Sequence, residues 1–127
     1  MILSFKPQLV TPILNEIKLH TIREDKYNRW HEGMEIQCAT GVRTKDYQCF
    51  AHRTCTGTQS ITLRDLKHSG AIILIDHTMI EPFRFSKDYF ILKQLATNDG
   101  FKTVTEFIEW FQAGFKGKII HWTDFRY

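Results

Sequence analysis

The chain has few of the features that mark several large classes of protein. Only three of its 127 residues are cysteine, and its longest apolar run, residues 71–75, is far too short to cross a bilayer. Three cysteines cannot all pair within one chain, and the opening letters MILSFKPQ lack the basic start and long apolar run of a signal peptide. These absences argue against a disulfide scaffold and against a membrane partner. They lead us to expect a reducing, cytoplasmic setting.

Several catalytic and cofactor motifs are also missing. The sequence contains no Gly-rich phosphate loop, no G-x-S-x-G elbow and no H-E-x-x-H motif. Cys49, His52 and Cys55 have a spacing that invites a zinc interpretation, with His68 as a distant fourth ligand. In an extended strand, however, Cys49 and Cys55 share one face while His52 points away from it. We therefore expect free thiols, no metal and no cofactor.

The composition that remains is enough for a globular core. Hydrophobic residues make up 43% of the chain, and ten of them are phenylalanine, so a core forms without disulfides. The length is that of one domain, residues 1–127. The net charge of +3 permits a nucleic-acid partner without demanding one.

The hydrophobic pattern predicts short strands first and helices late. Helical spacing favours a short helix over residues 8–15 and two later helices, one with Ser86 as N-cap and Gly100 as its stop, the other opening on a Thr103–Glu106 capping box. The strand candidates are residues 4–7, 18–23, 34–40, 47–57, 60–66, 71–75 and 118–124. This order indicates an α+β fold, a small barrel or curled sheet with helices at one end.

The segment KLHTIRED, residues 18–25, carries more polar chemistry than a strand that only fills a core. Thr21 and Arg23 are two residues apart, so they share a face of the strand. Lys18 and Thr21 are three apart and would diverge in a regular strand. They converge only if Lys18 lies in the turn before it.

The same segment resembles the start of an ASCH domain, a PUA-like family with the motif G-x-K-x-x-T-x-R. Lys18, Thr21 and Arg23 match that motif, and Gly33 in WHEGMEI matches the glycine before the family's second strand. Later, DGFKTVTEFIEWF resembles the family's Gly-Phe followed by a Glu-bearing helix, and GKIIHW resembles its last barrel strand. Glu16 stands where the motif has its first glycine.

The replacement of that glycine implies a different turn before Lys18. A glycine would adopt a positive φ there without strain. One option is that Asn15 takes the left-handed conformation instead.

The resemblance implies a PUA-like β-barrel of about five or six strands with flanking helices. It also implies a protein that binds RNA or a modified nucleoside in a cleft formed by the motif. Two alternatives stay open: an amidohydrolase that deacetylates N4-acetylcytidine or a related acylated base, and a non-catalytic protein-interaction domain.

In the enzymatic alternative, the resemblance assigns catalysis to Lys18, Thr21 and Glu106. A threonine hydroxyl is a weak nucleophile until a base takes its proton, and a lysine whose pKa is lowered by burial is such a base. The carboxylic acid then protonates the leaving amine. From the residues alone, Glu106 only caps a helix with Thr103.

The ligand-binding residues that we expect are Arg23, Tyr27 and Trp30. Arg23 belongs to the motif, and a cytidine ring would stack on an aromatic side chain such as Tyr27 or Trp30. The alternative for Arg23 is a surface salt-bridge cluster with Glu24 and Asp25.

Overall fold

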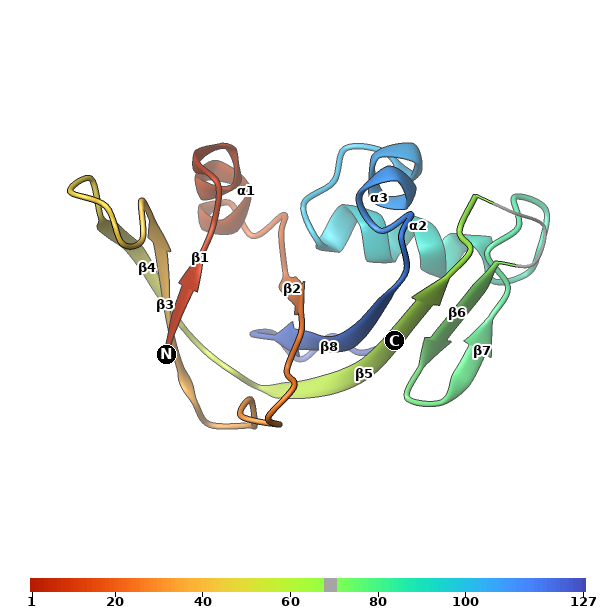
Figure 1. Ribbon diagram of the computed structural model, residues 1–127, viewed down its shortest axis with the longest axis horizontal. Coiled ribbons are helices and arrows are strands. Elements are labelled where there is room, and N and C mark those ends of the chain that lie inside the picture. The colour runs from red at the N-terminus through yellow and green to blue at the C-terminus, as the bar shows by residue number, and fades with distance from the viewer. Residues whose placement is uncertain (68–70) are drawn as a thin grey trace.

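The computed structural model describes residues 1–67 and 71–127. These residues form two β-sheets and a layer of helices (Figure 1). The elements are β1 (Ile2–Ser4), η1 (a 3₁₀ helix, Pro7–Leu9), α1 (Val10–Leu14), β2 (His20–Arg23), β3 (Glu35–Thr40), β4 (Gln48–Thr54), β5 (Gly57–Arg64), β6 (Ile72–Ile75), β7 (Thr78–Ile80), α2 (Tyr89–Asn98), α3 (Val104–Trp110) and β8 (Phe115–His121). The α+β prediction is confirmed. No helix in the described residues has the length and apolar character needed to span a membrane.

The strands form one sheet of three and one of five. The smaller sheet has the order β1-β3-β4, with β1 parallel to β3, and the larger is an antiparallel sheet of order β2-β8-β5-β6-β7. The chain passes from one sheet to the other where β4 leads into β5, and the three α-helices lie on one side of the molecule (Figure 1).

The prediction of a barrel is wrong in one respect, because the two sheets do not close. In residues 1–67 and 71–127 no backbone pairing joins β1 to β2. A side chain connects them instead, since the Arg23 guanidinium donates to the Ser4 carbonyl oxygen at 2.6 Å. A backbone carbonyl that accepts from a side chain is satisfied without a neighbouring strand.

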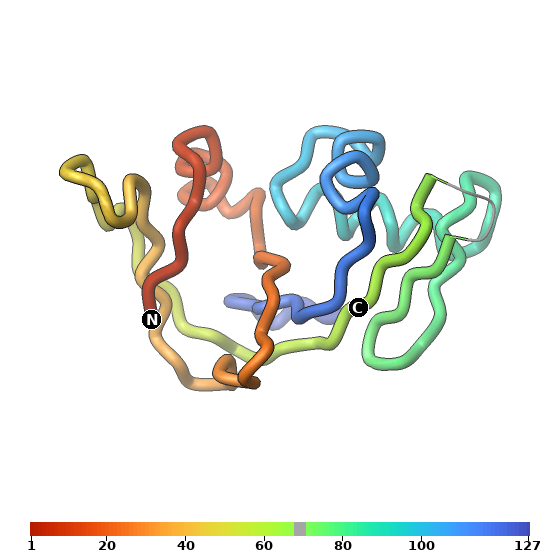
Figure 2. Tube along the Cα trace, in the orientation of Figure 1, coloured from red at the N-terminus to blue at the C-terminus, as the bar shows by residue number. Residues whose placement is uncertain are grey.

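Two hydrophobic clusters form the core. The larger one packs α2 and α3 onto the five-stranded sheet, through residues such as Leu63, Leu95, Phe107 and Ile119. The smaller one joins the three-stranded sheet to α1 and includes Ile13 and Trp30. The trace in Figure 2 shows the C-terminus returning beside β5, where the Tyr127 backbone bonds to the Gln59 side chain.

Local predictions around the late helices have mixed outcomes. The Gly100 stop and the Thr103 cap are confirmed: Gly100 has a φ of 94°, and the Thr103 hydroxyl accepts from the Glu106 amide at 3.1 Å. The Ser86 cap is wrong, because α2 begins at Tyr89 and the Ser86 hydroxyl donates to the Glu81 carbonyl. Strand β7 was not predicted.

Candidate functional site

The turn before β2 places Lys18 inside the protein. After α1 ends, Glu16 itself adopts the left-handed conformation with a φ of 59°, whereas Asn15 has a φ of −89°. The option that assigned this conformation to Asn15 is therefore wrong. The amides of Ile17 and Lys18 both donate to the Pro12 carbonyl, at 2.9 and 3.0 Å. Lys18 precedes the strand, so the alternation of a strand does not decide where its side chain points.

Lys18 is a buried cation with a partner far along the chain. It is only 2% exposed, and its Nζ donates to the Asp99 carbonyl at 2.5 Å and to Asp99 Oδ1 at 3.1 Å. A Cβ at Gly100 would lie 3.1 Å from Lys18 Cδ, so a glycine permits the close approach of the two segments. Burial lowers the pKa of Lys18, and the Asp99 charge opposes that shift only in part.

The Asp99 carboxylate also accepts a hydrogen bond from a histidine, His20. His20 Nδ1 lies 3.3 Å from Asp99 Oδ1, and His20 Nε2 lies 2.6 Å from the Tyr127 hydroxyl. Because a carboxylate accepts, Nδ1 carries the imidazole proton and Nε2 accepts from Tyr127. Asn98 Nδ2 donates to the same hydroxyl at 3.1 Å. Burial lowers the pKa of His20 and raises that of Tyr127, so both stay neutral at physiological pH.

A second buried histidine, His121, packs against His20, with 5.4 Å between the two ring centres. His121 Nε2 lies 3.0 Å from Gln59 Oε1, which also accepts from the Tyr127 amide at 3.0 Å. Burial lowers the pKa of His121 to about 3. Within the described residues its Nδ1 is buried with no hydrogen-bond partner. Gln59 thus ties the C-terminal residue to β5 and to a neutral histidine.

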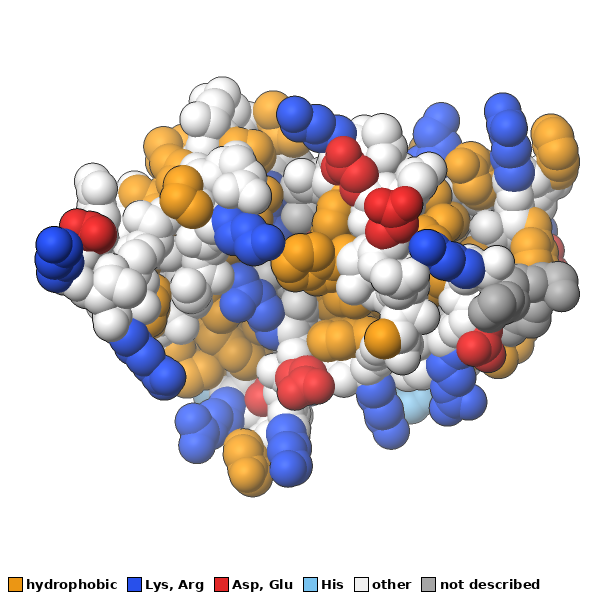
Figure 3. All heavy atoms as spheres, turned by 45° about the horizontal axis from the view of Figure 1, so that its top comes forward, with side chains coloured by type: hydrophobic (Ala, Val, Ile, Leu, Met, Phe, Trp, Pro, Cys, Tyr) orange, Lys and Arg blue, Asp and Glu red, His pale blue; other side chains and the backbone are white. Residues whose placement is uncertain are grey.

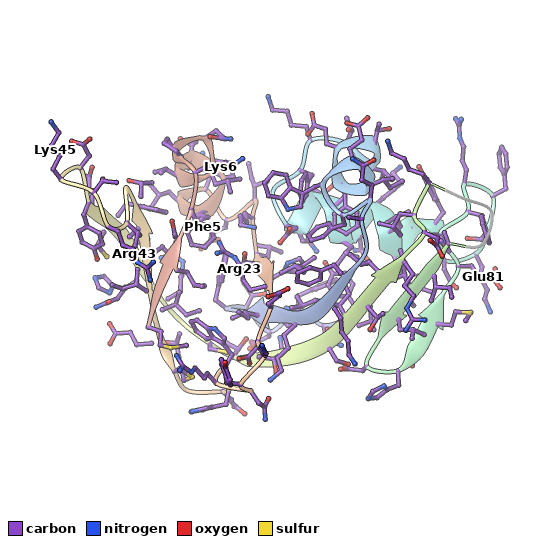
Figure 4. The ribbon with its side chains drawn as sticks, in the orientation of Figure 1. Phe5, Lys6, Arg23, Arg43, Lys45 and Glu81 are labelled. Atoms are coloured by element: carbon purple, nitrogen blue, oxygen red, sulfur yellow. The ribbon has the colours of Figure 1, made fainter. Side chains whose placement is uncertain are left out.

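Arg23 and Lys18 both lie near one phenylalanine ring, that of Phe5. Its Nε donates to Thr21 Oγ1 at 3.0 Å, and its guanidinium carbon lies 5.1 Å from the centre of the Phe5 ring. Lys18 Nζ lies 5.8 Å from the centre of the same ring. Figure 4 shows Phe5 and Arg23 between β1 and β2. We call Phe5, Lys18, Thr21, Arg23 and Asp99 the motif cluster.

An exposed aromatic side chain contacts the residue that follows Phe5. Lys6, which follows Phe5, places its Nζ 4.5 Å from the centre of the Trp110 ring, and Phe101 lies 6.3 Å from the same indole. Trp110 is 61% exposed. Figure 3 shows Lys and Arg side chains next to hydrophobic ones near the middle of this face. Cations and an accessible aromatic face therefore lie near one another on the surface.

The predicted catalytic residues are only partly brought together. Glu106 is exposed, and its carboxylate accepts from the Lys102 amide at 3.2 Å, as expected of a residue that caps a helix. The carboxylate that contacts Lys18 is Asp99. Thr21 bonds to Arg23, and no hydrogen bond joins it to Lys18 in residues 1–67 and 71–127.

The two predicted aromatic side chains lie in different surroundings, Tyr27 at the surface and Trp30 in the core cluster that also contains Phe5. Tyr27 is 73% exposed, and its ring lies beside the cations of Lys26 and Arg29. Trp30 is 7% exposed and packs in the smaller core, so it offers no open face to a ligand. The salt-bridge alternative for Arg23 also lacks support, since Asp25 pairs with Lys118 at 2.9 Å.

Sequence reasoning missed Asp99, His20 and Tyr127. Lys18 and Asp99 are 81 positions apart, and no spacing rule connects them. The available signal was the position of Asp99 directly before the Gly100 helix stop, in the segment DGF that resembles the family.

The described residues hold no group of three His, Cys, Asp or Glu side chains arranged to bind a metal ion. His68, the fourth zinc ligand of that interpretation, lies outside them. The prediction that His52 points away from Cys49 is wrong, because Cys49 Sγ lies 3.7 Å from His52 Nε2.

No family model, curated protein or solved structure matches this chain.

Proposed function

We propose that this protein binds a nucleoside, free or within single-stranded RNA, beside Arg23, the one partly exposed side chain of the otherwise buried motif cluster. The observation that carries the proposal is the position of Lys18 and Arg23 on one aromatic ring, 5.8 and 5.1 Å from its centre. Asp99 neutralises Lys18, whereas the hydrogen bonds of Arg23 go to neutral oxygens, so the guanidinium keeps its charge for a ligand. Guanidinium groups recognise phosphate through paired hydrogen bonds.

The exposed indole of Trp110 supplies the second contact. Nucleobases stack on aromatic faces, and nearby cations neutralise the backbone phosphates. Trp110 is accessible and carries the Lys6 cation over its ring. The resemblance of residues 16–33 to the ASCH motif supports the same function, and it supports a PUA-like arrangement that is open between β1 and β2.

Binding is tested by titrating cytidine 5′-monophosphate and a short single-stranded RNA into the protein. Arg23→Gln should weaken binding about tenfold, since a charged hydrogen bond is lost. Arg43→Gln is the matched control, because it removes the same charge from the exposed connection between β3 and β4 (Figure 4). Equal losses in the two variants would indicate unspecific attraction to the net positive charge. An unmodified protein that binds neither probe ends the proposal.

The second candidate is hydrolysis of N4-acetylcytidine or a related acylated base. It is favoured by the lowered pKa of Lys18 and by the Asp99 carboxylate that orients it. A neutral lysine would take the Thr21 proton as the hydroxyl attacks the acyl carbon. The resulting ammonium, held by Asp99, would protonate the leaving amine and leave the acyl group on the Thr21 oxygen. Water, giving a proton to Lys18, would then cleave this ester, which releases the carboxylic acid and restores the Thr21 hydroxyl. The site requires Thr21 to turn from Arg23 toward Lys18, and binding is therefore the better supported function.

Incubation with N4-acetylcytidine, followed by chromatography for free cytidine, tests this candidate. Thr21→Val keeps the side-chain shape and should abolish release if the hydroxyl is the nucleophile. If the unmodified protein releases no cytidine, the enzymatic candidate is refuted while the binding measurements stand on their own.

A further inference from the structure

A second reactive cluster lies on the three-stranded sheet. Cys49 Sγ is 3.7 Å from His52 Nε2, and His52 Nδ1 is 3.2 Å from Glu35 Oε1. The histidine and glutamate side chains are 62% and 69% exposed, and the thiol is partly exposed. Cys49 can thus act as a nucleophile, His52 as its base and Glu35 as the carboxylate that orients the base, each within hydrogen-bond distance of the next.

A β-bulge brings the three side chains to one face. In the pairing of β3 with β4, Cys38 lies opposite Ala51 and Ala39 lies opposite Cys49, so Phe50 is an extra residue in β4. Residues three apart in a regular strand face opposite sides, and one extra residue restores them to the same side. The exposure of the His52 and Glu35 side chains leaves this face open to small molecules.

The hydrogen bond to Glu35 selects one tautomer of the neutral His52 ring. A carboxylate only accepts, so Nδ1 carries the proton and donates to Glu35. The lone pair of Nε2 then faces the thiol. The thiol proton has a second acceptor in the Ala51 carbonyl at 3.6 Å, so the base competes with a neutral oxygen.

The other two cysteines lack these conditions. Cys38 and Cys55 are 0% and 1% exposed, and burial raises the pKa of each thiol. A thiol attacks as its thiolate, so burial makes both of them unreactive. Reactivity is thereby concentrated at Cys49.

We propose that Cys49 is a site of reversible S-thiolation by low-molecular-weight disulfides. The thiol gives its proton to His52 Nε2, and the sulfur attacks one sulfur of a disulfide R–S–S–R. The S–S bond breaks, and the leaving thiolate takes the proton from His52. The products are the mixed disulfide Cys49–S–S–R and the thiol R–SH, so the Cys49 sulfur is oxidised and the departing sulfur is reduced.

The test is to incubate the full chain with oxidised glutathione and follow adducts by intact mass and peptide mapping. One adduct should form, at Cys49. His52→Ala should slow it about tenfold, less than in enclosed sites because the pair is exposed to water. Added imidazole should restore part of the rate to this variant. His31→Ala is the matched control, an exposed histidine whose ring contacts only the Glu32 carbonyl in the described structure, and it should react at the unmodified rate.

Three results would overturn the proposal. One is an adduct that forms first on Cys38 or Cys55. Another is a His52→Ala rate equal to that of the unmodified protein while circular dichroism shows an intact fold. The third is a Cys49→Ser variant that still takes up one glutathione.

Discussion

Lys18→Met should destabilise the protein far more than the loss of an ordinary surface lysine. The substitution keeps the length and apolar stem of the side chain but removes the ammonium that contacts Asp99 at 3.1 Å. Asp99 is 7% exposed and would retain only its His20 contact at 3.3 Å. Breaking a buried ion pair by removing one partner costs about 3–5 kcal/mol, because the other charge stays buried and uncompensated.

For a chain of this length the loss is large in thermal terms. An unfolding entropy of roughly 2 cal/mol/K per residue converts each kcal/mol into about 4 °C, so the midpoint should fall by about 12–20 °C. Thermal unfolding followed by circular dichroism, with urea titration at 25 °C, measures both quantities. Lys6→Met is the control, since its exposed ammonium only lies over the Trp110 ring and its loss should cost about 0.5–1 kcal/mol.

The double variant Lys18→Met/Asp99→Leu separates charge from packing. It removes both charges and leaves two neutral groups without these partners, the His20 N–H and the Asp99 carbonyl oxygen. It should therefore recover to within about 2 kcal/mol of the unmodified protein. The reasoning fails if Lys18→Met costs less than about 1 kcal/mol, or if the double variant is as unstable as the two single variants summed.

Three further predictions concern residues around this site. His121 is neutral in the folded state with a pKa of about 3, whereas the unfolded chain protonates it below about pH 6.5. The contribution of His121 to stability is therefore constant above that pH and falls as pH drops toward 3, by about 1.4 kcal/mol at pH 5.5. Urea titration of the unmodified protein and His121→Asn at pH 7.5 and 5.5 measures it, and equal losses in both would contradict it. Thr103→Ala should lower the free energy of unfolding by about 1 kcal/mol, because the N-cap of α3 is lost. Glu106→Gln should leave the melting temperature unchanged. If Glu106→Gln abolished cytidine release while the melting temperature stayed the same, Glu106 would be a catalytic residue after all. Gly100→Ala should destabilise by at least about 1 kcal/mol, since its φ of 94° disfavours a side chain and the new Cβ would crowd Lys18; a stabilised variant would refute this.

The sequence by itself determined the features that depend on neighbours along the chain. The Gly100 stop and the Thr103 cap follow from local sterics and from hydrogen bonds over three or four residues. Strand alternation also gave the condition that Lys18 and Thr21 converge only if Lys18 lies in the turn before the strand, and Lys18 does precede β2.

Only the tertiary structure decided which groups meet across the fold. Asp99 reaches Lys18 because α2 packs so that its C-terminal end lies against the turn after α1, a contact over 81 positions that no local pattern encodes. The Phe50 bulge turned His52 toward Cys49 because the register of β4 is set by its partner strand, not by its own sequence. The two sheets do not close into a barrel, and Trp30 is buried in the core. Both outcomes depend on how the two sheets and the helices pack around their shared apolar residues, which no local pattern encodes.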